Sequence, residues 1–262
     1  MKEPRKSIPA LCLLLLFFCG CAAAPKITVR MDFASPEAAL EYIAAQTRVY
    51  AALEAIAHVH VATREGAYPL KLAVLLKKPA SLRVEAIPLF GPPAFFLSIR
   101  DRTLKVFLTE TRAFYIGRAT GDNVARYLPL KMDPEDLIAL LTGTCFAPAG
   151  PVTLLQGSQE GNHYRIDIVE PLKRRSVWVR MTDGFIERIE YFWGEQRLYR
   201  AHFEEPIRRE GTVLPQKITI VSEGTDGVSV SIRYADIQFL KDIDPARFNL
   251  DTPPGVEPVH LD

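Results

Sequence analysis

The first regular pattern along the chain is an apolar stripe that returns every three or four residues between Ser35 and Ile56. This spacing is typical of an amphipathic helix. Ser35 can cap the free backbone N–H groups, Pro36 fits the first helical turn and Glu37 favours the positive helix end. We therefore predict a long N-terminal helix whose apolar face comprises Leu40, Ile43, Thr47, Tyr50, Leu53 and Ile56.

From His58 onward the period changes to two. Apolar and polar side chains alternate most clearly in residues 82–86, 103–108, 163–168 and 228–234. Such alternation is typical of antiparallel strands with one face toward a core or cavity and the other toward water. Glycine-containing turns separate the runs, so we expect about eleven to thirteen strands, joined mostly as hairpins.

Two short helices interrupt the strands, at 121–128 and 133–142. The second begins Asp133-Pro134-Glu135-Asp136, a cap followed by proline and acids, and has an apolar face. The order of helix, strands, two helices and strands predicts an α+β fold in which one large antiparallel sheet holds helices on one face. We expect a single domain over residues 35–262 that ends in a proline-rich tail.

The N-terminus has the layout of a secretory signal. Basic residues precede an apolar run from Ala10 to Phe18, which is too short to cross a bilayer. Cys21 follows Gly20, which resembles the lipobox of bacterial lipoproteins and implies a signal over 1–20, a diacylglycerol-modified Cys21 and a tether over 21–34. Ala22 then implies sorting to the outer membrane of a Gram-negative bacterium, facing the periplasm. The alternative is an ordinary secretory signal that is cut after Ala22, Ala23 or Ala24.

The charge balance limits the expected classes of partner, and the cysteine count limits the expected thiol chemistry. Residues 1–20 hold three of the 32 basic and one of the 31 acidic side chains, so 29 basic and 30 acidic side chains follow. Without a basic excess, we expect no nucleic-acid partner. With Cys12 and Cys19 in the signal and Cys21 acylated, Cys145 is the one remaining thiol. Its apolar surroundings predict a buried, unreactive cysteine.

Several short stretches resemble the LolB-like family of outer-membrane lipoprotein receptors. They are residues 81–99 with the loop Pro88-Leu89-Phe90-Gly91, residues 133–143, residues 184–192 and the segment 214–218. The resemblance covers most of the chain after the signal. It implies an unclosed antiparallel β-barrel with a helical lid around an apolar cavity for the acyl chains of other lipoproteins. The implied partners are the membrane, through Cys21, together with acylated lipoproteins and a periplasmic lipoprotein carrier, with the receptor itself a monomer.

The loop at 87–93 also has an interpretation of its own. Its prolines lack the N–H that a central strand needs, so it must form a turn, and turns lie at the surface. Exposed Leu89 and Phe90 would contact a membrane or cargo; the resemblance gives this role to Leu89, with Phe90 as an addition to the family's pattern. The alternative is that both side chains fold back into the core. The candidate cavity-lining residues are Phe95, Phe107, Leu137 and Leu141, although the phenylalanines could equally fill a core.

Catalysis has little support in the sequence. His58 and His60 would share one strand face but lack a third metal ligand nearby, and no Gly-x-Ser-x-Gly nucleophile motif or phosphate-binding glycine loop is present. The acids 133–136 are explained by a helix start, and basic clusters such as Lys173-Arg174-Arg175 by solvated turns. We therefore expect a non-enzymatic binding protein without metal or cofactor. Three roles stay open: a lipoprotein receptor, a carrier or sensor of another amphiphile such as a phospholipid or glycolipid, and a structural lipoprotein that recruits a protein.

Overall fold

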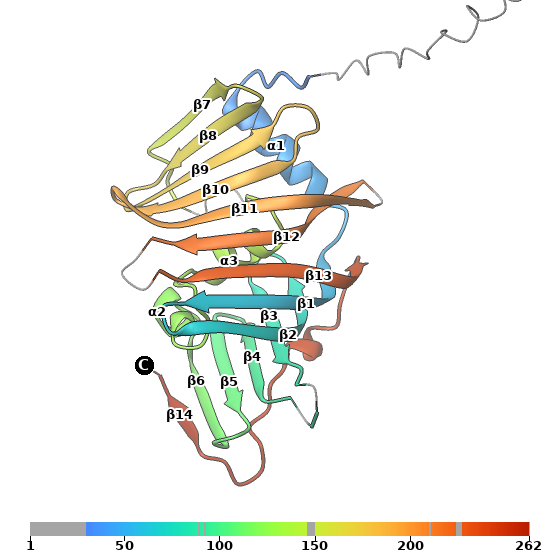
Figure 1. Cartoon of the computed structure of the whole chain (residues 1–262), viewed down its shortest axis with the longest axis vertical. Coiled ribbons are helices and arrows are strands. Elements are labelled where there is room, and N and C mark those ends of the chain that lie inside the picture. The colour runs from blue at the N-terminus through green and yellow to red at the C-terminus, as the bar shows by residue number, and fades with distance from the viewer. Residues whose placement is uncertain are drawn as a thin grey trace, which may run out of the picture.

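One sheet forms the body of the protein. The computed structural model describes residues 30–88, 90–91, 93–145, 150–209, 211–223 and 227–261. Fourteen strands lie in this sheet, which curls strongly between its two halves but does not close (Figure 1). In chain order they are β1 (Ala52–Thr63), β2 (Gly66–Lys77), β3 (Ser81–Ala86), β4 (Phe95–Arg100), β5 (Thr103–Leu108), β6 (Ala113–Arg118), β7 (Leu154–Glu160), β8 (His163–Val169), β9 (Lys173–Arg180), β10 (Ile186–Trp193), β11 (Gln196–Arg209), β12 (Thr212–Ser222), β13 (Ser229–Leu240) and β14 (Pro258–His260).

The strand order is β14-β6-β5-β4-β3-β2-β1-β13-β12-β11-β10-β9-β8-β7. Most neighbours are consecutive hairpins, and the antiparallel pairing of β1 with β13 joins the two halves. The exception in direction is β14, which pairs with β6 in parallel. The alternating pattern thus predicted an antiparallel sheet correctly, with one strand more than expected.

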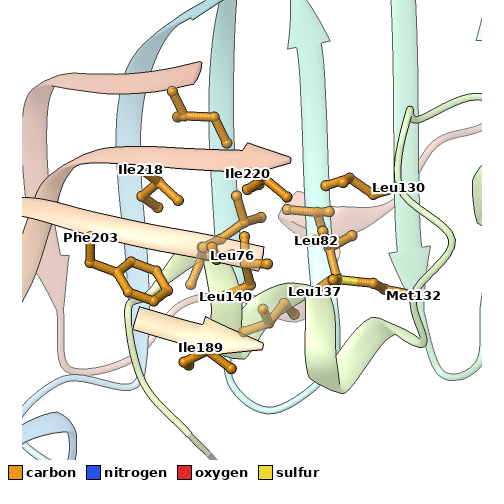
Figure 2. Close-up of a cluster of buried hydrophobic side chains, with 14 of the residues drawn as sticks. Leu76, Leu82, Leu130, Met132, Leu137, Leu140, Ile189, Phe203, Ile218 and Ile220 are labelled. Atoms are coloured by element: carbon orange, nitrogen blue, oxygen red, sulfur yellow. The ribbon is translucent and has the colours of Figure 1, made fainter. Parts of the chain in front are cut away.

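The concave face of the sheet is apolar because alternate residues of nearly every strand point there. In β1 these are the odd-numbered residues from Leu53 to Val61. They pair with every second residue of β2, from Leu76 back to Tyr68. The intervening residues point to the convex face, and in β1 they include Glu54, His58 and His60. Figure 2 shows a cluster of buried hydrophobic side chains in which residues from both halves of the sheet lie with residues of α3.

Within the described residues, three α-helices accompany the sheet: α1 (Pro36–Thr47), α2 (Gly121–Ala125) and α3 (Pro134–Leu141). The Oγ of Ser35 accepts a hydrogen bond from the Ala38 N–H at 3.2 Å, which is the predicted N-cap. However, α1 has twelve residues and is shorter than the sequence pattern predicts. Leu53 and Ile56, assigned above to the helical stripe, belong to β1. The alanine-rich segment fits both periods, and pairing with β2 and β13 selects the strand.

The C-terminal segment covers the convex face of β3 to β5. A 3₁₀ helix over Pro245–Phe248 lies against this face, and the Ser98 hydroxyl donates to the Phe248 carbonyl. The Lys105 ammonium donates to the Leu250 carbonyl at 3.2 Å. The predicted proline-rich tail therefore packs against the domain and ends as its edge strand, β14.

Candidate functional site

An apolar cavity of about 330 Å³ lies on the concave face, at the lower end of the size range of small-molecule sites. Side chains of β1, β2, β3, β4 and β13 form its floor. The segment between α2 and α3, together with α3 itself, covers it. Its lining residues are Ala57, Val59, Val61, Leu70, Leu72, Val74, Leu82, Val84, Ala86, Phe95, Tyr127, Leu128, Pro129, Leu130, Leu137, Leu141, Val230, Ile232 and Tyr234.

Among the described residues, no charged side chain lines this cavity. Of its two hydroxyl groups, that of Tyr234 donates to the Leu141 carbonyl at 2.9 Å. Leu70 is 44% exposed, and on the same strand Tyr68, outside the lining, is 48% exposed. The site can therefore hold an apolar group, and it offers no charged side chain for chemistry on it.

Hydrogen bonds and ion pairs fasten the cover to the sheet. The Lys131 N–H donates to the Tyr199 hydroxyl at 2.5 Å. At the start of α3, Asp133 pairs with Lys173, and Asp136 lies 3.6 Å from the Arg175 guanidinium. The cover is thus held at both ends of α3, by charge at its start and by Tyr234 at its finish.

Arg175 is the centre of a buried charged cluster that the sequence analysis missed. Lys173–Arg180 is strand β9 and not a solvated turn, and Arg175 is only 6% exposed. Its guanidinium lies 3.3 Å from the Glu170 carboxylate, and a guanidinium nitrogen lies 3.9 Å from the Cys145 sulfur. The available signal was its place at an inward position of the alternating run Arg175-Val177-Val179.

Burial sets the protonation of this cluster. Desolvation raises the pKa of Asp136, against the lowering effect of Arg175 and Lys173. It also raises the pKa of the Cys145 thiol, which is buried as predicted. A buried thiol with a raised pKa is a poor nucleophile, so this cluster is suited to holding α3 in place.

The candidate lining residues do not all lie together. Phe95, Leu137 and Leu141 line the cavity, the first from β4 and the others from α3. Phe107 does not. The register pairs Phe107 with Phe96, whose ring centroid is 6.3 Å away, and with Phe114, so all three point to the opposite face. Because Phe95 and Phe96 are adjacent in one strand, Phe95 and Phe107 cannot share a face.

The loop before β4 carries one highly exposed apolar side chain. Phe90 is 92% exposed, the largest value among the exposed large hydrophobic residues. It therefore does not fold back into the core, which was the alternative interpretation for this loop. Leu89 and Cys21 lie outside the described residues.

Among the described residues, no group of three or more His, Cys, Asp or Glu side chains is arranged to hold a metal ion. His58 and His60 lie exposed on the convex face of β1. No described helix has both the length and the apolar character to cross a membrane.

No protein-family model matches the chain, and neither does any curated protein. Solved structures do match it. A LolA superfamily protein from Nitrosomonas europaea superimposes with a TM-score of 0.62 at 14% identity, over 82% of this chain and 98% of its own. A domain named for outer membrane lipoprotein sorting, from Vibrio parahaemolyticus, gives 0.59 at 12% identity, over 82% and 96%.

The chain therefore shares the fold of these two structures. A DUF1329 family protein from Desulfovibrio piger shares it, with a TM-score of 0.64 at 11% identity over 82% of this chain and 97% of its own. At these identities the likeness concerns the architecture: an open, curled antiparallel sheet of similar extent. The expected unclosed sheet is therefore confirmed.

Proposed function

We propose that this protein is a non-catalytic periplasmic lipoprotein, anchored in the outer membrane by Cys21, that binds an acyl chain in its cavity and receives or inserts lipoproteins there. The observation that carries the proposal is the cavity, whose described lining is almost entirely apolar and whose cover is a separate helical segment. The lipobox-like start of the sequence supports the anchor. The neighbour named for lipoprotein sorting shows that this fold serves proteins so described.

The physical case rests on the cost of exposing a hydrocarbon chain to water. A dry apolar cavity of about 150 Å³ admits benzene, so about 330 Å³ admits roughly a dozen carbons. At about 0.8 kcal/mol per buried CH₂, enclosing them stabilises the bound state by about 10 kcal/mol. Transfer to a membrane then needs no nucleotide, because the bilayer offers the same burial.

Size also favours a second candidate. The closed cavity has room for part of one alkyl chain, whereas an acylated lipoprotein carries several, so the receptor role requires the α2–α3 cover to move. A carrier or sensor of a single-chain or phospholipid-like amphiphile requires less opening. Mass spectrometry of lipids that co-purify with the protein separates these two roles.

The receptor role is tested by capture. The soluble Cys21→Ala chain is mixed with a periplasmic carrier loaded with an acylated lipoprotein, and bound cargo is identified after pull-down. Capture of the acylated cargo and not of its unacylated form supports the proposal. Equal capture of both forms, or of neither, contradicts it.

Two variants separate capture of the cargo from its insertion into a membrane. Ala86→Leu places extra carbon in the cavity and should reduce capture, whereas Ala67→Leu, on the exposed convex face of β2, should not. Phe90→Ser should leave capture intact and slow insertion of the cargo into vesicles, since Phe90 is exposed and is not among the residues that line the cavity.

A further inference from the structure

Four exposed apolar side chains gather at one end of the strands β7 to β10. Val152, Leu154, Leu172 and Trp193 are 41%, 49%, 61% and 49% exposed; we call them the end patch. They lie where these strands meet the turns at the left of the upper half in Figure 1. Globular proteins expose single apolar residues freely, but a cluster of them marks a contact surface.

Backbone pairing places the end patch at one end of neighbouring strands, with Leu154 and Trp193 on opposite faces of the sheet. The Gly194 N–H donates to the Leu172 carbonyl at 3.1 Å, which brings the β8–β9 and β10–β11 turns together. Leu154 pairs with Val169, the last residue of β8. Three strand spacings, about 14 Å, therefore separate Leu154 from Trp193 across the sheet.

We infer that the end patch inserts into the surface of a lipid bilayer. Leucine and tryptophan at the tips of neighbouring turns are the side chains that favour the boundary between headgroups and acyl chains. Four side chains are few for a stable protein interface, which takes about 20 to 30 residues a side. This inference rests on the proposed lipid anchor, because shallow insertion of a few side chains needs a tether to persist.

The anchor can reach this orientation. Arg30 donates from its guanidinium to the Gly161 carbonyl at 2.6 Å, in the turn at the opposite end of β7. From there the end patch is about 20 Å along β7. Nine residues link Cys21 to Arg30 and span at most about 30 Å.

Charge around the end patch is balanced. Lys173 and Arg174 follow Leu172, but Lys173 pairs with Asp133, and the Arg174 guanidinium lies 3.8 Å from the Phe192 ring centroid. Glu195 adds an exposed acid at the neighbouring turn. We therefore expect insertion to depend on apolar burial and to be as strong in zwitterionic as in anionic vesicles.

The chain's two tryptophans make the test direct. Trp178 is 7% exposed, with the Arg188 guanidinium 3.6 Å from its ring centroid, so a Trp178→Phe variant leaves Trp193 as the reporter. The chain beginning at Cys21, which retains every described residue, is coupled through that thiol to maleimide-lipid in phosphatidylcholine vesicles; buried Cys145 does not compete. Brominated acyl chains should then quench Trp193 emission at least about twofold.

Matched variants complete the test. Leu172→Ser should reduce the quenching. Val259→Ser should leave it unchanged, because Val259 is as exposed as Trp193 but lies on the edge strand at the far side of the sheet. Trp193 emission that is the same in brominated and ordinary vesicles overturns the inference. Because the anchor here is chemical, that result is separate from failure of the proposed lipidation, which mass spectrometry of Cys21 from cells would show.

Discussion

The Tyr234 hydroxyl, on β13, donates a buried 2.9 Å hydrogen bond to the carbonyl of Leu141, the last residue of α3. Tyr234 lies in the strand that joins the two halves of the sheet, and both residues line the cavity. One bond therefore ties the floor of the cavity to its cover. The helix carbonyl it satisfies has no intrahelical partner of its own.

Removing this bond should loosen the cover. Tyr234→Phe keeps the ring but leaves the Leu141 carbonyl without its donor, which costs about 1–3 kcal/mol for a buried group. Urea unfolding monitored by circular dichroism measures the loss. A change within error of zero would show that the bond does not hold α3 in place.

The ion pairs of Arg175 near the start of α3 should contribute more to stability than the Tyr234 hydrogen bond. Arg175→Met leaves Asp136 and Glu170 largely buried beside an apolar side chain, and breaking a buried ion pair in this way costs about 3–5 kcal/mol. Adding Asp136→Asn to this variant should restore part of the stability, since one uncompensated charge is removed. If the double variant is no more stable than Arg175→Met alone, Asp136 is not the partner that matters.

Lys78 should make the free energy of unfolding depend on pH. Burial lowers its pKa from 10.5 to about 8, and its ammonium lies 3.7 Å from the Tyr50 ring centroid. Between these two pH values the unfolded chain binds more protons, so stability contributed by this site rises as the pH rises from about 8 toward 10. Comparing urea unfolding of the native protein and Lys78→Met at pH 7.5 and 9.5 should show a smaller gain in the variant. Equal gains would contradict the assignment.

The turn that ends α3 depends on a glycine. Gly143 has a φ of +61°, and a Cβ there would lie 2.4 Å from the Cδ of Pro215. Gly143→Ala therefore combines left-handed strain of about 1–2 kcal/mol with a backbone or proline shift. Gly161→Ala is the matched control, because its φ is +59° and nothing lies within 4 Å of the added carbon. Thermal unfolding should separate the two variants by several degrees; equal losses would show that the contact with Pro215 is unimportant.

Periodicity predicted most of the architecture. Alternation located the sheet, and caps placed the helices near 121–128 and 133–142 within a few residues. Its failure between Leu53 and Ile56 has a physical cause: leucine, isoleucine and alanine at this spacing satisfy a helix and a strand alike. Pairing decides between them: β1 pairs with β2, which follows it in the chain, and with β13, which is distant in sequence.

The cavity lining was less predictable, because the pairing register decides on which face of the sheet a side chain lies. Phe95 and Phe107 look equivalent as aromatic strand residues, yet pairing across β4 and β5 sends them to opposite faces. Arg175 shows the converse problem, since a basic run appears solvated until the strand that contains it is placed against α3. Such partners lie some 40 residues apart, and local composition carries no information about them.

The central claim is that the cavity takes one alkyl chain, and a binding titration tests it most directly. A fluorescent long-chain fatty acid is titrated into the Cys21→Ala protein, with native mass spectrometry to count the bound molecules. The account predicts one molecule per protein, binding weakened at least about tenfold by Ala86→Leu, which fills the cavity, and binding unchanged by Ala67→Leu. Absence of binding, or equal binding by both variants, would contradict it.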